Sequence, residues 1–281
     1  PSQSSAASDV YKRQGYNIRK LIRSYTEYPL IEIKDRISNQ ASKNQIPSTV
    51  FQTWETRYLG KTHSKSIEIF RDKNPSLSFF LYDKEHRDDY MQSQWGKEDI
   101  SKIYFNSNFG PMKADIFRYC ILHDKGGYYF DIAKGCDCPL NQLHNENDKG
   151  VITYEDNECF YPPRNSKLFN LKRPFNYFLQ WGLAFSSKHL FLEKLINEIC
   201  SDYPNYKDKL FQNPKLAILN FTGPGMYTKV MRKYISKYDI SDFAELDVKF
   251  NNNGIFKIKG SSVRHYTVPS YTYVKNLKIC N

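Results

Sequence analysis

The segment from residue 114 to residue 131 constrains the fold of this chain more than any other. Apolar and aromatic residues recur at helical spacing through its first part, so one face of a helix there can be buried. Gly126 and Gly127 end that helix, because glycine adopts the left-handed cap conformation without steric cost. The aromatic run 128–130 suits a short buried strand, and Asp131 follows it directly.

Asp131 is therefore expected at the carboxyl end of a strand. Open α/β sheets bind their ligands at this edge. A carboxylate there suits a divalent metal ion that bridges a phosphate-bearing substrate. The simpler alternative is an aspartate that only caps the turn after the strand.

The remaining chain alternates between expected strands and helices, which predicts an α/β fold with a Rossmann-like, mostly parallel sheet flanked by helices. We expect strands at 48–54, 77–82, 151–154 and 177–185, and a strand-rich region at 246–275. We expect helices at 57–73, 84–105, 188–200 and 225–234.

The 281 residues suit one domain at 46–281, preceded by a lead-in segment at 15–45. Residues 9–14 are those encoded by the end sequence of a transposon used in sequencing-library preparation. We therefore predict that residues 1–14 are a sequencing artefact, the alternative being a serine-rich tail.

The net charge of +11 comes from Lys and Arg residues that are spread along the chain. Such a charge fits an anionic ligand or an acidic membrane surface, and peripheral membrane association stays open. The chain has no aromatic RNA-binding signature, so we do not expect a nucleic-acid partner. No apolar run approaches the roughly 20 residues that a membrane-spanning helix needs.

Four segments together resemble the glycosyltransferase family with the sugar-binding DXD motif (family 32), which includes fungal α-1,6-mannosyltransferases and capsular polysaccharide transferases. They are Ile46–Trp54, the run 73–83 with its Asn-Pro and Tyr-Asp, the block 114–131, and Thr222-Gly223-Pro224. The resemblance implies a GT-A fold, a nucleotide-sugar donor and retaining transfer of the sugar to a hydroxyl. It also implies a divalent metal, Mn²⁺ or Mg²⁺.

The resemblance also implies roles for individual residues. The catalytic residues implied are Asp115, Arg118 and Asp131. The implied donor contacts are these three residues together with Gln52, Thr53, Trp54, Gly126 and Gly127. Thr222 and Gly223 are implied on the acceptor side, and Asp131 with His265 is implied at the metal. Simpler alternatives exist for some of them: an intrahelical ion pair between Asp115 and Arg118, and a packing role for Trp54 and His265. Glu155 and Asp156 either bind acceptor hydroxyls or face solvent.

The chain departs from the family pattern at Ala133, where the second carboxylate of the DXD motif is expected. Alanine cannot bind a metal, and three possibilities stay open. Asp131 holds a metal together with a later ligand such as Asp137. Alternatively Lys134 or another cation replaces the metal, or the site binds the donor without turnover.

The sequence therefore predicts a retaining hexosyltransferase that uses a GDP- or UDP-linked sugar. The expected acceptor is a glycan or lipid-linked glycan, as in polysaccharide biosynthesis. The alternatives are a catalytically inactive relative that binds a sugar nucleotide, and a polyanion-binding surface protein. The expected compartment is cytoplasmic or membrane-peripheral for a bacterial or viral chain, and the Golgi lumen for a eukaryotic one.

Overall fold

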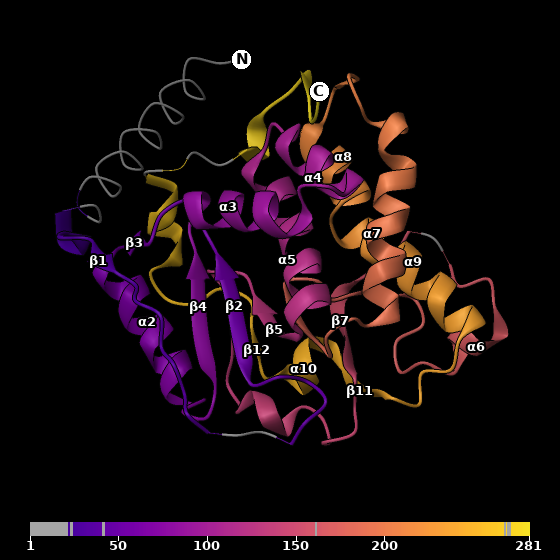
Figure 1. Cartoon of the computed structure of the whole chain (residues 1–281), viewed down its shortest axis with the longest axis horizontal. Helices are drawn as coiled ribbons and strands as arrows, with labels where there is room; N and C mark the ends of the chain where they lie inside the picture. Colours follow the sequence, from indigo (N-terminus) through magenta and orange to yellow (C-terminus); the bar gives the residue numbers. More distant parts are fainter. Residues whose placement is uncertain (1–21, 23–24, 41–42, 161, 267, 269–270) are drawn as a thin grey trace, which may run out of the picture.

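The computed structural model describes residues 22, 25–40, 43–160, 162–266, 268 and 271–281. Residues 1–14, the predicted artefact, lie outside this range, as does part of the lead-in segment. A seven-stranded sheet forms the centre of the molecule (Figure 1). From edge to edge its strands are β11 (Phe243–Asp247), β7 (Gly150–Glu158), β9 (Gly182–Phe185), β5 (Gly127–Phe130), β2 (Thr49–Thr53) and β4 (Ser78–Tyr82), with β8 (Asn176–Phe178) paired to β7.

The pairing pattern makes this sheet mostly parallel. Strands β4, β2, β5, β7 and β11 run in one direction, whereas β9 and β8 run in the other. The carboxyl ends of the first five strands and the start of β9 therefore lie at the same edge of the sheet. The predicted α/β class and the helix-flanked, mostly parallel sheet are confirmed.

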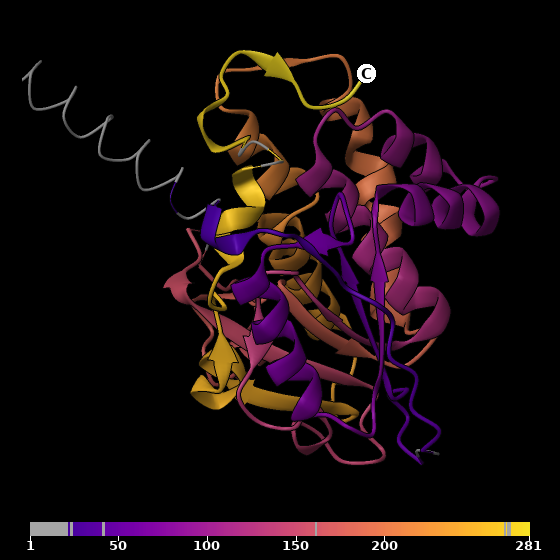
Figure 2. The same cartoon turned by 90° about the vertical axis from the view of Figure 1, so that its left-hand side faces the viewer.

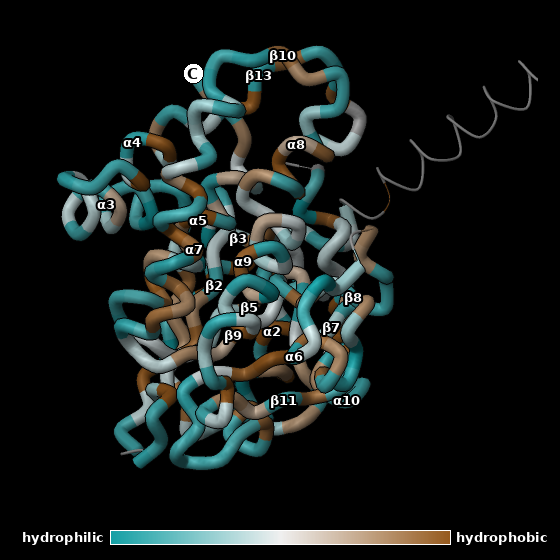
Figure 3. The backbone as a smooth tube through the Cα atoms, turned by 90° about the vertical axis from the view of Figure 1, so that its right-hand side faces the viewer, coloured by the Kyte–Doolittle hydropathy of each residue, from teal (hydrophilic) through white to brown (hydrophobic). Residues whose placement is uncertain are grey.

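Helices cover both faces of the sheet, and each face has its own hydrophobic core. The helices are α2 (Lys61–Asp72), α3 (Lys84–Trp95), α4 (Asp99–Phe105), α5 (Gly110–Lys125), α6 (Ser166–Phe169), α7 (Leu190–Asp202), α8 (Pro214–Phe221), α9 (Pro224–Lys237) and α10 (Val248–Asn252). The larger core joins one face to α5, α7 and α9, and the smaller core joins the opposite face to α2 and α10. Figure 3 shows the apolar segments inside these layers and the hydrophilic loops around them.

Three short strand pairs and several 3₁₀ turns complete the described structure. The pairs are β1 (Ile31–Glu32) with β3 (Tyr58–Leu59), β6 (Gly135–Cys136) with β12 (Gly254–Ile255), and β10 (Leu210–Phe211) with β13 (Leu277–Lys278). The 3₁₀ turns are η1 (Leu140–Gln142), η2 (Tyr203–Asn205), η3 (Ser261–Tyr266) and η4 (Tyr271–Tyr273). Turn η3 packs against the start of α2, near the carboxyl end of β2 (Figure 2).

The block predicted at 114–131 folds as α5, a two-glycine break and β5. Gly126 and Gly127 have φ values of 67° and 95°, which disfavour any other residue type. A Cβ at Gly127 would lie 2.4 Å from the carbonyl oxygen of Thr49, so β5 can approach β2 only with glycine there. These glycines fix β5, and with it Asp131, beside β2.

Three sequence expectations differ from the structure. The helix expected at 84–105 is two helices, because a turn around Gly96 interrupts it. The strand expected at 177–185 is two strands, β8 and β9, separated by residues 179–181. The described part of 246–275 is not strand-rich: after the end of β11 it holds α10, the two-residue β12 and the turns η3 and η4, and its Asn-Asn-Asn-Gly run favours a turn.

Candidate functional site

Arg118 lies between two carboxylates at the carboxyl edge of the sheet. Its Nη2 is 3.1 Å from Oδ1 of Asp115, one turn earlier in α5, and 2.9 Å from Oδ1 of Asp131, directly after β5. Its Nη1 donates at 2.9 Å to the carbonyl of Gln180, which lies in the connection between β8 and β9. The guanidinium thus joins three elements, and the structure brings together the three residues predicted to be catalytic.

Asp115 is buried, and both oxygens of its carboxylate have partners within the protein. Oδ1 accepts from Nε2 of Gln180 at 2.9 Å, and Oδ2 accepts from Oγ1 of Thr222 at 3.0 Å. Burial raises the pKa of Asp115, while the Arg118 charge and these hydrogen bonds oppose the rise. Asp115 therefore fixes Arg118 in place and does not face open solvent.

Asp131 is the open member of this group, because its side chain is 32% exposed. Its Oδ1 also accepts from the hydroxyl of Tyr129 at 3.2 Å, and the Arg118 guanidinium lies 4.7 Å from that ring centre. Burial lowers the pKa of Arg118, but the charges of Asp131 and its neighbours outweigh this and raise it overall, so the cation is permanent. Among the described residues no side chain donates to Oδ2 of Asp131, which leaves this oxygen for a ligand.

The predicted donor-contacting residues lie at the end of β2, the strand next to β5. Gln52 is 1% exposed, yet neither its Nε2 nor its Oε1 has a hydrogen-bond partner among the described residues. An unpaired buried amide is costly, so the position favours a polar ligand. Nε1 of Trp54 is also without such a partner, and its ring contacts Arg264 and His265.

Thr53 has a different role, because its hydroxyl is used within the protein. Oγ1 donates to the carbonyl of Tyr82 at 2.7 Å and accepts from Nη1 of Arg87 at 3.1 Å. Arg87 is 1% exposed and also donates to Glu55 and to the hydroxyl of Tyr104. Arg87 and Gln180 are positioning residues that the sequence analysis missed, since each acts through contacts distant in sequence.

Thr222 and Gly223, predicted on the acceptor side, lie between α8 and α9. Thr222 is buried, with its hydroxyl on Asp115 and its carbonyl accepting from Tyr119 at 2.7 Å. Gly223 forms the N-cap of α9. Contact of either residue with an acceptor stays a prediction, and the structure shows Thr222 as a support for Asp115.

The described residues do not fit a metal site built by the protein alone. Ala133 supplies no ligand, and Asp137 lies away from Asp131 in an ion pair with Lys73. Nδ1 of His265 lies 3.2 Å from the carbonyl of Val268. No group of three or more His, Cys, Asp or Glu residues in the described part of the chain could hold a metal ion.

A second charged group lies within electrostatic range of Asp131, in the loop after β5. Lys134 follows Asp131 by three residues, and its Nζ is 3.1 Å from the ring centre of Phe256 and 5.4 Å from that of Trp181. Burial lowers the pKa of Lys134 to about 8, against the opposing charges of Asp131 and Glu155. Burial also raises the pKa of Glu155, which lies in β7.

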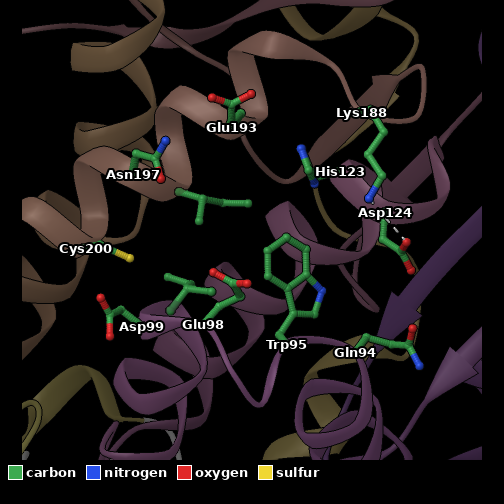
Figure 4. A pocket seen from close by; sticks show the side chains of 12 residues that line it. Gln94, Trp95, Glu98, Asp99, His123, Asp124, Lys188, Glu193, Asn197 and Cys200 are labelled. Carbon is green, nitrogen blue, oxygen red and sulfur yellow. Dashed lines mark ion pairs between the residues drawn. The ribbon is translucent and has the colours of Figure 1, made fainter.

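A separate cavity of about 440 Å³ lies between α3, α4, α7 and the far end of α5 (Figure 4). Trp95 stands in its centre, with Asp124 and Lys188 at one side and Cys200 at the other. None of the predicted site residues lines this cavity. The candidate site is therefore the sheet edge at Asp131.

Comparison with known proteins shows which family the chain resembles. The model of the family described as "Glycosyltransferase sugar-binding region containing DXD motif" matches residues 12–149. The chain is 26% identical over 210 residues to the initiation-specific alpha-1,6-mannosyltransferase of Candida albicans and 28% identical over 210 residues to that of Schizosaccharomyces pombe. Each match covers 68% of this chain, and 53% and 49% of the relatives.

A mannosyl phosphorylinositol ceramide synthase of Saccharomyces cerevisiae is 23% identical over 224 residues, which cover 77% of this chain and 52% of that protein. The chain thus spans about half the length of the curated relatives it matches. Among solved structures, the PaToxG glycosyltransferase matches with a TM-score of 0.49 and 16% identity, over 81% of this chain and 80% of that one.

Proposed function

Because the chain belongs to the glycosyltransferases whose sugar-binding region contains a DXD motif, we propose that it transfers a hexose from a nucleotide-sugar to a glycan hydroxyl with retention of configuration. GDP-mannose is the first donor to test, since the names of the fungal relatives specify mannosyl transfer. UDP-hexoses are the alternative donors. The observation that carries this proposal is the open Oδ2 of Asp131, a carboxylate whose Oδ1 is held by Arg118 at the sheet edge.

The site residues have different proposed roles in such a reaction. A departing nucleoside diphosphate gains negative charge, which fixed cationic groups stabilise. Arg118 is enclosed by Asp115 and Asp131, so it orients Asp131 and leaves the diphosphate charge to other cations at this edge. Asp131 has one oxygen available to accept a hydrogen bond from a hydroxyl of the donor.

The nucleotide is expected at the end of β2. Gln52 offers an amide donor and an amide acceptor, a pair that can recognise a base or a ribose. Arg87 keeps Thr53 and the following turn in place. This arrangement leaves the sugar end of the donor beside Asp131, on the neighbouring strand β5.

The acceptor and the compartment stay predictions: a glycan or lipid-linked glycan, reached in the cytoplasm, at a membrane surface or in the Golgi lumen. No helix in the described part of the chain is both long and apolar enough to cross a membrane.

The proposal is tested by calorimetry with GDP-mannose, UDP-glucose and UDP-galactose, followed by assay of nucleoside diphosphate release. We expect one donor to bind and to be consumed. Asp131→Asn should lower this turnover strongly, while Asp137→Asn, which alters an exposed carboxylate outside the site, should leave it intact. Equal turnover in the Asp131→Asn variant would refute the assignment of the site.

A second candidate function is a relative that binds a sugar nucleotide without turnover, which Ala133 favours because it removes a family carboxylate. Donor binding with no release of diphosphate would support that reading. Salt-sensitive binding of heparin without nucleotide affinity would instead support a polyanion-binding protein.

A further inference from the structure

Lys134 carries an ammonium group that has no polar partner in the described part of the chain. Its Nζ lies against the Phe256 and Trp181 rings, and it makes no hydrogen bond or ion pair with any described residue. Neighbouring lysines differ, because Lys249 pairs with Asp156 and Lys73 pairs with Asp137. A partly buried cation without a polar partner is costly, so the site favours an anionic ligand.

Two more cations lie within electrostatic range of Lys134. Arg264 and Lys249 both lower the pKa of the Lys134 ammonium, whereas Asp131 and Glu155 raise it. Asp131 in turn acts on Arg264, opposing the effect of burial on the Arg264 pKa. The edge beyond Asp131 therefore has three cations, from the loop after β5, from α10 and from η3.

The backbone of α10, which carries Lys249, has an unusual conformation. Lys249, Phe250 and Asn251 have φ values of 46°, 57° and 56°, the left-handed helical region that non-glycine residues avoid. The amide of Phe250 donates to Oγ1 of Thr153 at 2.9 Å, and its ring is buried in the smaller core. Such strain persists where surrounding contacts hold it, and it is common at ligand sites.

Negatively charged side chains cluster beside the ends of β2 and β4, away from Lys134. An open groove of about 770 Å³ at the ends of β2 and β4 is lined mostly by carboxylates: Glu32, Glu55, Asp83, Glu85, Asp88 and Asp89, with Arg57 and Lys84. A diphosphate would be repelled from this groove and attracted to the Lys134 side.

We propose that Lys134 binds the diphosphate of the nucleotide-sugar donor directly, and that donor binding needs no divalent metal. This inference rests on the proposed function and deepens it. Ala133 fits this arrangement, because a carboxylate at 133 would compete with the donor phosphates for the Lys134 ammonium. The ammonium supplies three hydrogen-bond donors and one positive charge to the phosphate oxygens.

Calorimetric titration with GDP and UDP, in EDTA and in Mn²⁺, tests this inference. We expect one nucleotide to bind equally well in both buffers. Lys134→Met should weaken that binding by about tenfold or more, the effect of losing one charge-assisted contact. The matched control Lys73→Met removes a paired lysine outside the site and should leave binding unchanged.

Titration with guanosine and uridine separates phosphate contacts from base contacts. Lys134→Met should leave the affinity for the nucleoside unchanged, and an unaltered unfolding temperature shows that the variant folds. Binding that requires Mn²⁺, or full GDP or UDP affinity in Lys134→Met, would overturn the inference while keeping the proposed function. Absence of nucleotide binding in both buffers would instead overturn the proposed function itself.

Discussion

The two sides of Asp131 differ in how their charges are satisfied. On the α5 side, Arg118 is enclosed by carboxylates and carbonyls, and Asp115 has a partner for each oxygen. On the α10 side, Lys134 faces aromatic rings without a polar partner among the described residues. The satisfied side fixes geometry, and the unsatisfied side keeps its charge available to a ligand. Stability and binding are therefore expected to respond differently to mutation on the two sides.

The largest expected effect lies on the α5 side. Arg118→Leu should lower the free energy of unfolding by about 3–5 kcal/mol, because it leaves Asp115 and Asp131 without their cation. Urea unfolding monitored by circular dichroism measures this change. The Arg118→Lys variant keeps the charge but loses the forked contacts, so its loss should be intermediate. If Arg118→Leu changed the free energy of unfolding by less than about 1 kcal/mol, the proposed difference between the two sides of Asp131 would be wrong.

On the α10 side, acid should lower the free energy of unfolding through His63. This residue is 0% exposed and contacts the carbonyl of Ile132. Burial lowers its pKa to about 4, with a further lowering by Arg264 and opposing effects of the Ile132 hydrogen bond and Glu27. Between pH 6.5 and pH 4 the unfolded chain binds more protons at this residue than the folded one.

The contribution of His63 to stability is thus complete above pH 6.5 and is lost as the pH falls towards 4, by about 3 kcal/mol. Urea unfolding at pH 7, 5.5 and 4 measures the slope. The His63→Leu variant should have a flatter dependence on pH. An unchanged slope would assign the acid sensitivity to other groups, such as His189, whose pKa burial also lowers to about 4.

Asp131, between the two sides, should affect activity more than stability. Asp131→Asn is expected to lower kcat/KM for the donor by about 100-fold or more, equivalent to about 2.7 kcal/mol of transition-state stabilisation. Its loss of folding stability should be smaller than that of Arg118→Leu, because its side chain is partly exposed. The reverse order, with stability lost and activity kept, would place Asp131 in the support of the fold only.

The smallest expected effect is that of Lys134→Met on folding. Removing an unpaired, partly buried charge and keeping most of the side-chain volume should change the free energy of unfolding by less than about 1 kcal/mol, or raise it. Chemical denaturation of the two proteins without ligand makes the comparison. A loss of several kcal/mol would mean that Lys134 has a structural partner.

The sequence predicts the α5–β5 block well because its signals are local: helical spacing, two glycines and an aromatic strand within 18 consecutive residues. Asp115, Arg118 and Asp131 are brought together by that block alone. Gln180 and Arg87 are not predicted, because their contacts depend on how the connection between β8 and β9 packs on α5 and how α3 packs against β2. The error at 246–275 has another cause, since the Asn-Asn-Asn-Gly run favours a turn where a strand was expected.

The glycines that let β5 approach β2 also fix the distance between the carboxyl ends of these two strands. Thr53 and Asp131 end neighbouring parallel strands, whose backbones lie about 4.8 Å apart. The separation between the two predicted ends of the donor site is thus set by main-chain hydrogen bonds and does not depend on loop conformation. If the donor binds across these two strand ends, we expect a longer or shorter link between base and sugar to be accommodated by side-chain changes and not by a change in the spacing of the strands.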